Sequence, residues 1–283
     1  MNKPAALTGW RALVYFWDGG WLGVGWGGSG TVPPHSHHAA QISIGLDGPI
    51  AMRPGDGEWQ ELRAGAVQPD AEHAFDPRGR KVAMLFVDPE SHEGRWLSRS
   101  LRHVITELKP EKIAGLLPAL SRFDEDLPSE EEATRLIGDV VRAACAGPPP
   151  IVSHDERIHK ALAFIRSAGS RQLSQEEVAR EVFLSPSRFA HLFTEEMGLP
   201  FRRFLLWRKV MLAMAAFGRG GTLSEAAHEA GFADSAHLTR TWHQMFGLPP
   251  SLMMGAAKFY EIPSPFASSA ATPSRRPSRD AGQ

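Results

Sequence analysis

The sequence predicts an α+β protein: an N-terminal antiparallel β-barrel, then a set of helices, then an all-α domain built from two similar units. Three observations support this fold class. Short apolar runs alternate with Gly, Pro and Asp turns as far as about residue 88, which is typical of antiparallel strands. Apolar stripes of helical period follow. A pattern of helix, tight turn and helix then occurs twice near the C-terminus.

Residues 1–90 form the predicted β domain. Its clearest strands are the apolar runs Leu13–Trp17, Ala40–Leu46 and Val82–Val87, whose spacing is typical of a barrel or sandwich. Five tryptophans lie in its first sixty residues: Trp10, Trp17, Trp21, Trp26 and Trp59. They suit either the mouth of a ligand-binding barrel or the barrel core.

Residues 91–147 are predicted to be a helical connector. One apolar stripe runs from Ile113 to Leu120 and another from Leu136 to Ala144. Residues 148–154 form a linker, because three successive prolines cannot continue a helix. The two flanking domains are therefore expected to fold separately. Residues 262–283, rich in Ser, Pro, Ala and Arg, are predicted to be a disordered tail.

The C-terminal repeat is defined by an apolar residue every fourth position before a Gly-Leu-Pro stop. The first copy places Phe189, Phe193 and Met197 before Gly198, and the second places Leu238, Trp242 and Phe246 before Gly247. This spacing makes one stripe of a helix. Glycine ends each helix because it enters the left-handed region without steric cost.

A shorter amphipathic helix precedes each copy. Ser174 with Glu177, and Thr222 with Glu225, have the spacing of capping boxes. The short helices end at tight connections, Phe183–Ser185 in the first copy and 231–233 in the second. The unit is thus a helix-turn-helix, present twice, which is typical of DNA-reading proteins.

The region from Asp155 to about Met254 resembles the AraC/XylS family of transcription regulators. The strings that carry the resemblance are Leu173-Ser174-x2-Glu177-Val178-Ala179, Ser185-Pro186-Ser187-x-Phe189-x3-Phe193, Gly231-Phe232-x4-His237-Leu238-x-Arg240 and Phe246-Gly247-Leu248-Pro249-Pro250-Ser251. The resemblance implies a DNA-binding domain over residues 155–256, with two helix-turn-helix units joined by a long helix from Pro200 to about Phe217.

The exposed N-terminal positions of each second helix are the candidates for contact with base edges. They are Ser187, Arg188, Ala190 and His191 in the first unit, and Ser235, Ala236, His237, Thr239 and Arg240 in the second. Arg240 is the strongest candidate, because Arg pairs bidentately with guanine in the major groove. Residues 153–254 carry 12 Lys/Arg and 10 Asp/Glu, a net charge of only +2, so tight DNA binding is expected to rely on dimerisation or an effector.

Two further strings in the β domain bring polar residues together. They are Gly30-x4-His35-Ser36-His37-x3-Gln41-x6-Gly48 and Gly65-x3-Pro69-x3-His73. Both resemble the motifs of the cupin barrel, in which two His, a carboxylate and a third His hold one metal ion. Here Gln41 takes the place of the carboxylate.

His35, His37, Gln41 and His73 are therefore the candidate effector-binding residues. Three interpretations remain open: His35, His37 and His73 hold a divalent metal ion, the cluster contacts an organic effector directly, or it only fills the barrel. His38 is expected to face the other way and lie on the surface, because neighbours on a strand point to opposite sides.

Two functions follow from these observations. One is a ligand-responsive regulator whose partners are double-stranded DNA, a small-molecule effector, RNA polymerase and a second copy of the chain. The alternative is a metal-dependent cupin-type enzyme with an accessory helical domain. The single cysteine, Cys145, excludes an intrachain disulfide framework. No apolar run reaches the ~20 residues of a membrane span and the N-terminus has no apolar signal core, so a cytoplasmic protein without a membrane partner is expected.

Overall fold

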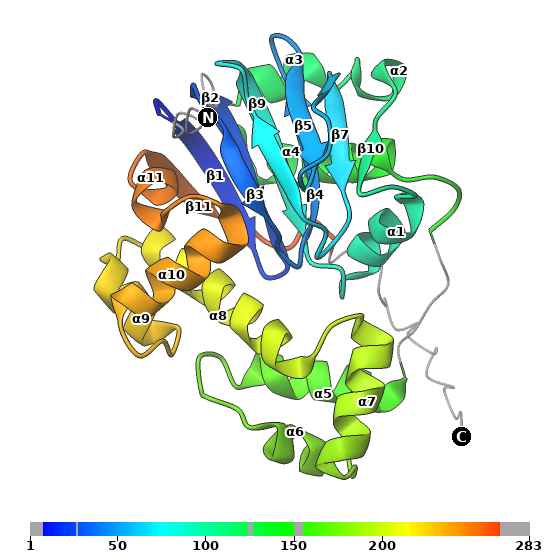
Figure 1. The fold of residues 1–283 in the computed structure, drawn as a ribbon, viewed down its shortest axis with the longest axis vertical. Coiled ribbons are helices and arrows are strands. Elements are labelled where there is room, and N and C mark those ends of the chain that lie inside the picture. The colour runs from blue at the N-terminus through cyan, green and yellow to red at the C-terminus, as the bar shows by residue number, and fades with distance from the viewer. Residues whose placement is uncertain (1–7, 27, 124–126, 150–154, 267–283) are drawn as a thin grey trace, which may run out of the picture.

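The computed structural model describes residues 8–26, 28–123, 127–149 and 155–266. Strands come first and helices follow, as predicted (Figure 1). The strands of the N-terminal half are β1 (Arg11–Trp17), β2 (Gly20–Trp26), β3 (Val32–His35), β4 (Ala40–Gly45), β5 (Ile50–Pro54), β6 (Gln60–Leu62), β7 (Ala64–Val67), β8 (His73–Asp76), β9 (Lys81–Val87) and β10 (Ile105–Glu107).

These strands form two sheets. The larger has the order β10-β7-β4-β9-β2-β1-β11, and the smaller has the order β3-β8-β5-β6. No ladder within the described residues joins one sheet to the other. The predicted barrel is therefore not closed, and the two sheets form a sandwich, the other arrangement that the strand spacing allowed. Pro33 and Pro34 contribute to this, because they remove two backbone donors from β3 and confine it to the edge of its sheet.

The larger sheet is covered on both faces. Along β9, Met84 and Phe86 belong to the core shared with the smaller sheet, whereas Ala83 and Leu85 belong to a core shared with helices. The alternation is the period-2 pattern of a strand, but every residue of β9 is buried. The molecule is thus layered: small sheet, large sheet, helices.

The connector helices form the outer layer. They are α1 (His92–Ser100), α2 (Pro110–Ile113), α3 (Leu117–Ser121) and α4 (Glu130–Ala144). Ser129 and Glu132 form a complete capping box that starts α4. The predicted stripe from Ile113 to Leu120 is not one helix. The chain ends α2 at Ile113 and restarts at α3, whose first turn contains Pro118, a residue that is tolerated only at a helix start.

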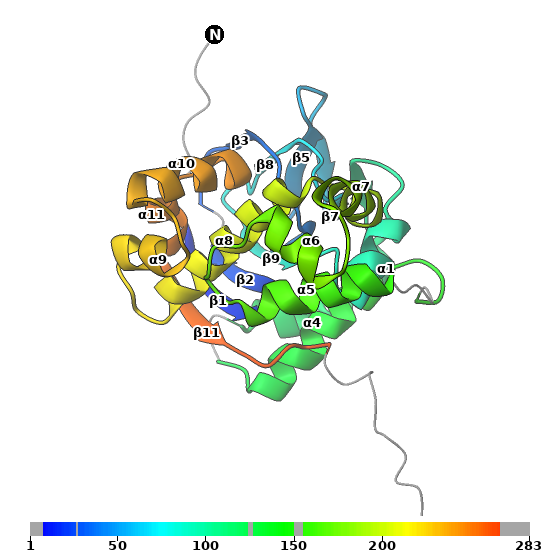
Figure 2. The same cartoon turned by 90° about the horizontal axis from the view of Figure 1, so that it is seen from below.

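The C-terminal half contains the two predicted units and the long helix between them. Its elements are α5 (Glu156–Ser167), α6 (Gln175–Glu181), α7 (Pro186–Met197), α8 (Phe201–Gly218), α9 (Leu223–Glu229), α10 (Ser235–Phe246), α11 (Pro250–Met254) and β11 (Ala257–Glu261). In Figure 2, α7 and α10 both lie toward the upper side of the molecule, with α8 crossing between them.

The helix ends agree largely with the prediction. Gly198 and Gly247 are left-handed, with φ of 77° and 70°. The capping box of Thr222 is complete. That of Ser174 is only half formed, because the side chain of Glu177 pairs with Arg171 instead of returning to the cap.

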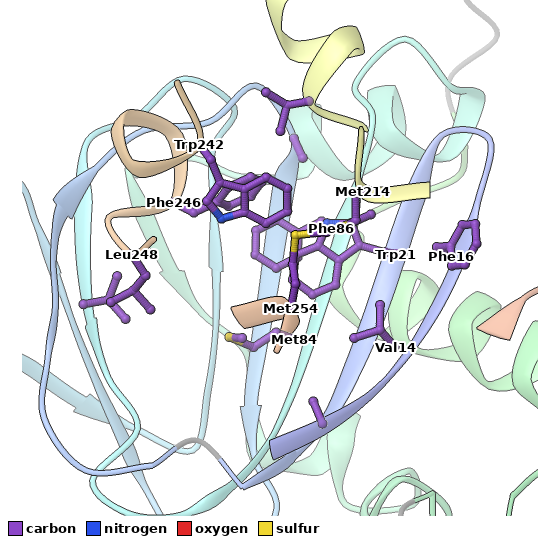
Figure 3. Close-up of a cluster of buried hydrophobic side chains, with 14 of the residues drawn as sticks. Val14, Phe16, Trp21, Met84, Phe86, Met214, Trp242, Phe246, Leu248 and Met254 are labelled. Atoms are coloured by element: carbon purple, nitrogen blue, oxygen red, sulfur yellow. The ribbon is translucent and has the colours of Figure 1, made fainter. Parts of the chain in front are cut away.

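The β domain and the second helix-turn-helix unit share one hydrophobic core. Trp242, Phe246 and Leu248 enter the same cluster as Trp21 and Phe86 (Figure 3). The first unit has a separate core, which includes Phe189 and Phe193. The expectation that the two domains fold separately is therefore not met for the second unit.

The chain after α11 returns to the β domain. Strand β11 pairs in parallel with β1, so the polypeptide is not all-α after the linker. Ile262 is buried and donates its N–H to the carbonyl of Phe16, and the ring of Phe266 packs edge-on against Trp17. Residues 262–266 are thus packed, contrary to prediction. The rest of the expected tail, 267–283, and linker residues 150–154 lie outside the described residues.

Three of the five tryptophans are core residues. Trp10, Trp17 and Trp21 are buried, whereas Trp26 and Trp59 are exposed. None of the described helices has the length and apolar character that crossing a membrane requires.

Candidate functional site

The four candidate effector residues come together between the two sheets. His35 on β3 lies opposite His73 on β8, His37 lies just before β4, and Gln41 lies on β4. All four are buried. Ring centroids are 4.3 Å apart for His35 and His73, and 5.1 Å apart for His37 and His73. The structure thus gathers every residue that the two sequence strings indicated.

Backbone carbonyls fix the tautomer of each imidazole. The Nδ1–H groups of His35, His37 and His73 donate to the carbonyls of Pro33, Ala39 and Ala71, at 2.8, 3.0 and 3.0 Å. A neutral imidazole carries only one N–H. Each Nε2 is therefore left with a free lone pair.

Two of these lone pairs meet the side chain of Gln41. Its Oε1 is placed 2.8 Å from Nε2 of His37 and 3.1 Å from Nε2 of His73. Oxygen and neutral Nε2 are both acceptors, so neither contact is a hydrogen bond in this orientation. Two arrangements resolve the conflict. The amide turns over, so that its NH₂ donates to both rings and Ser43 donates to Oε1, or a cation lies among the four acceptors.

Burial keeps the three rings uncharged. It lowers the pKa of His35 to about 3, with the nearby His37 adding to the effect. Burial also lowers the pKa of His37 and takes that of His73 well below its ordinary 6.5. Neutral imidazole is the form that binds metal.

The cluster fits a transition-metal ion. One nitrogen from each of His35, His37 and His73 lies within 4.8 Å of the others. Ligand atoms in a tetrahedral site lie roughly 3.4 Å apart, so the rings would need only a modest inward rotation. Imidazole suits zinc, copper, iron and nickel, and ligand histidines commonly donate the other N–H to a carbonyl, as all three do here.

The space beside the cluster is small. The adjoining cavity, which His35, Gln41 and Phe86 help to line, has a volume of about 30 Å³. Ordinary organic ligands occupy pockets of ~300–1,000 Å³, whereas ~30 Å³ corresponds to one water molecule. In this conformation the cluster has room for an ion and none for an organic effector.

The second helix-turn-helix unit covers the cluster. The Phe246 ring at the end of α10 lies 6.0 Å from His37, and Trp207 of α8 lies 6.4 Å from the same ring. A Cβ added to Gly247 would lie 3.1 Å from Nδ1 of His35. The histidines therefore lie directly beneath the C-terminal end of α10.

His38 is buried, which corrects its expected place on the surface. Its Nδ1 lies 2.8 Å from Asp70 and its Nε2 2.5 Å from Glu90. These two carboxylates outweigh burial and raise the pKa of His38 to about 10. His38 does face away from the cluster, but a loop and α8 cover that side, and its ring lies 6.4 Å from Phe204.

The predicted base-contacting positions are all accessible. Ser187, Arg188, His191, Ala236 and Arg240 are exposed, and Ala190, Ser235, His237 and Thr239 are half-buried. Ser185 and Asp234 cap α7 and α10 through their side chains. The turn before α7 places Phe183 at φ 56°, where glycine would be free of strain.

Comparisons with known proteins agree with this geometry. A family model described as a helix-turn-helix domain matches residues 178–254. Regulatory protein PocR of Salmonella typhimurium is 26% identical over 127 residues, 44% of this chain and 38% of PocR, so the chain spans well under half of that relative. Two crystal structures of ToxT from Vibrio cholerae are similar in fold. ToxT of strain O395 has a TM-score of 0.55 and 11% sequence identity, and the match covers 84% of this chain and 98% of ToxT. ToxT of strain SCE256 with a bound unsaturated fatty acid has a TM-score of 0.54 and 12% identity, and the match covers 91% of this chain and 100% of ToxT.

The C-terminal half of the chain thus contains a helix-turn-helix domain, in which the structure places two units joined by α8. Its two units are not equivalent, because only the second shares a core with the β domain.

Sequence reasoning missed the polar contacts between this helix-turn-helix domain and the β domain. Trp207 donates its indole N–H to Asp88 at 2.9 Å, and Arg203 reaches Asp70 at 3.4 Å. Trp207 follows Phe204 at a helical spacing, and this could have marked it as a buried position. Its partner in another domain leaves no local signal.

Proposed function

We propose that this protein regulates transcription by binding duplex DNA through α7 and α10, and that a transition-metal ion held by His35, His37, His73 and Gln41 is its effector. The observation that carries the effector assignment is the convergence of buried, neutral Nε2 lone pairs on the Gln41 oxygen. A bound ion would accept the lone pairs of the three Nε2 atoms and of the Gln41 oxygen, which otherwise face one another without a proton between them. Gly247 and Phe246 then connect the occupancy of the cluster to α10.

Metal analysis tests this assignment. Protein purified without added metal is expected to contain, or to take up on titration, about one zinc, iron or nickel ion per chain. The double variant His37→Ala/His73→Ala should bind none and should lose the effector response while retaining basal DNA binding. The control is His92→Ala on the exposed surface of the same half of the chain. Wild-type protein that takes up no ion would overturn the assignment.

An organic effector is a second candidate, and a different feature favours it. A pocket of about 410 Å³ lies between the β1–β2 turn, α5 and α8. Its walls include Trp17, Phe204 and Met211. Its charged residues are the cations Arg166, Arg208 and Arg219 and the carboxylates Asp18, Asp88, Glu90 and Glu261, so an acid would have to bind at the end of the pocket that α5 and α8 form. ToxT has been crystallised with an unsaturated fatty acid, and an elongated apolar acid has the chemistry that this pocket could accept. Binding of a fatty acid that shifts DNA affinity in the double His variant would support this candidate.

The covered cluster favours a regulator over the cupin-type enzyme. An enzyme needs space for substrate beside its ion, and about 30 Å³ does not provide it. We further propose RNA polymerase and a second copy of the chain as partners. This part of the proposal rests on the proposed regulatory function alone.

A further inference from the structure

A basic pocket lies on the C-terminal domain between its two helix-turn-helix units. It has a volume of about 180 Å³ and is formed by α8, the end of α5 and the α5–α6 loop. Its cationic residues are Arg171, Arg202, Arg208 and Lys209, and no acidic residue in the described part of the chain lines it. Helix α8 itself carries four basic residues and no acidic one.

The charges in this pocket are only partly neutralised. Arg171 pairs with Glu177. Lys209 and Arg208 donate to the carbonyls of Gly231 and Arg166, which are uncharged acceptors. Within the described residues, Arg202 is exposed and has no hydrogen bond or ion pair. Burial, with the nearby charge of Arg166, lowers the pKa of Arg208 against the opposing effects of Asp18 and Asp88.

The pocket touches both units. Leu173 lines it and immediately precedes the N-cap of α6 in the first unit. Lys209 holds Gly231, which begins the turn leading to α10 in the second unit. A linear polyanion that reached both recognition helices would pass between them, and Figure 2 shows α8 crossing that interval.

The recognition helices supply little charge of their own. Arg188 is the only Lys or Arg of α7, and Arg240 is the only one of α10. Phosphate contacts dominate the affinity of proteins for DNA. Further cations for those contacts are therefore expected elsewhere in the domain, and the pocket brings four of them together.

We propose that this pocket binds phosphate, and that the phosphate belongs to the DNA backbone between the two grooves that α7 and α10 enter. Guanidinium groups suit the geometry of phosphate oxygens. The inference rests on the proposed DNA-binding function and adds a phosphate site outside both helix-turn-helix motifs.

The salt dependence of binding to a random-sequence duplex of roughly three helical turns tests the inference. Arg202→Gln should reduce the slope of log K against log salt by about 1, and Arg202→Glu should weaken binding further. The matched controls are Arg219→Gln and Arg219→Glu, because Arg219 caps the same helix outside the pocket and pairs with Glu229. Thermal unfolding confirms that each variant is folded.

The outcomes separate this inference from the proposed function. Wild-type protein that shows no salt-dependent DNA binding would overturn the function itself. Wild-type binding with Arg202 variants that behave like the Arg219 variants would overturn only the pocket. A calorimetric titration with inorganic pyrophosphate gives the remaining arm: binding that Arg202→Glu abolishes, with an unchanged DNA slope, would overturn the DNA source and assign the pocket to a free phosphate ligand.

Discussion

Gln41 decides what kind of ion the histidine cluster can hold. A glutamate here would add a negative charge to the metal site and favour hard cations, whereas the amide leaves an all-neutral ligand set that imidazole dominates. Ser43 lies 2.8 Å from the amide nitrogen and fixes the side chain in either orientation. The sequence predicted these four residues as a cluster, but the tautomers depend on the carbonyls of Pro33, Ala39 and Ala71, which no side-chain pattern reveals.

Asp88 makes stability depend on pH at the contact between the β domain and α8. Burial and, next in size, the charge of Glu90 raise the pKa of Asp88 from 3.8 to about 7, and Asp18 adds to the rise. The hydrogen bond from Trp207 and the charge of His38 oppose it. Arg208 also faces the carboxylate of Asp88. The folded protein thus keeps a proton that the unfolded chain releases. The contribution of Asp88 to stability is present below pH 3.8 and is lost as the pH rises toward 7.

The variant Asp88→Asn is expected to remove this loss of stability with rising pH, because an amide does not ionise. Its oxygen can still accept the hydrogen bond from Trp207. The melting temperature of the variant relative to wild type should rise between pH 5 and 7 and stay level above that. A difference that does not change with pH would show that Asp88 ionises normally in the folded protein.

Arg240 is the residue on which sequence-specific reading is predicted to depend. It is exposed on α10, whose buried residues Leu238 and Trp242 belong to the shared core. Arg240→Ala should cost ~1–3 kcal/mol of DNA-binding free energy and relax the preference at one base pair. Footprinting and affinity measurements on a selected site check this. The control is Gln244→Ala, because Gln244 is an exposed residue nearer the C-terminal end of the same helix. An Arg240 variant with wild-type specificity would refute the assignment.

At the scale of elements, sequence patterns predicted what is local and missed what is distant. The two glycine stops and the Thr222 box follow from a few adjacent residues. The half-formed Ser174 cap depends on Arg171, and the pairing of β11 with β1 joins residues about 245 positions apart in the chain. The apolar stripe between Ile113 and Leu120 predicted one continuous helix, and this was wrong because a new helix begins with Pro118 in its first turn.

Gly198 and Gly247 form a matched pair for measuring the contact between α10 and the cluster. Both are left-handed helix caps with nearly equal φ. A Cβ at Gly198 would meet nothing within 4 Å, whereas one at Gly247 would lie 2.9 Å from Val32 Cγ1 and 3.0 Å from the Pro33 carbonyl.

Gly198→Ala should cost only the backbone strain of about 1–2 kcal/mol. Gly247→Ala should cost roughly 1–3 kcal/mol more in the free energy of unfolding, because β3 and the cluster must move to make room. Urea denaturation measures both. Equal losses in the two variants would mean that α10 is not held against β3 in solution.

At the scale of the whole molecule, the sequence predicted two separately folding domains on either side of the prolines, whereas the structure packs the second helix-turn-helix unit against the β domain. Composition marks a break near residue 148, and the sequence pattern of Trp242 and Phe246 indicates core residues of a helical domain, which they also are. Nothing in their spacing shows that their other faces meet Trp21 and Phe86. The result couples the second unit to the β domain and leaves the first unit attached through α8.

Hydrogen exchange should reveal this unequal coupling as two levels of protection. Amides of α10 are expected to open with the same free energy as those of β2 and β9, since all three contribute to one core. Amides of α7 belong to the smaller core around Phe189 and Phe193 and should exchange through a less costly opening. Metal added to the protein should raise the protection of α10 more than that of α7, because His35 lies against Gly247. Equal protection of α7 and α10, together below β2 and β9, would show instead that the two units open as one independent domain.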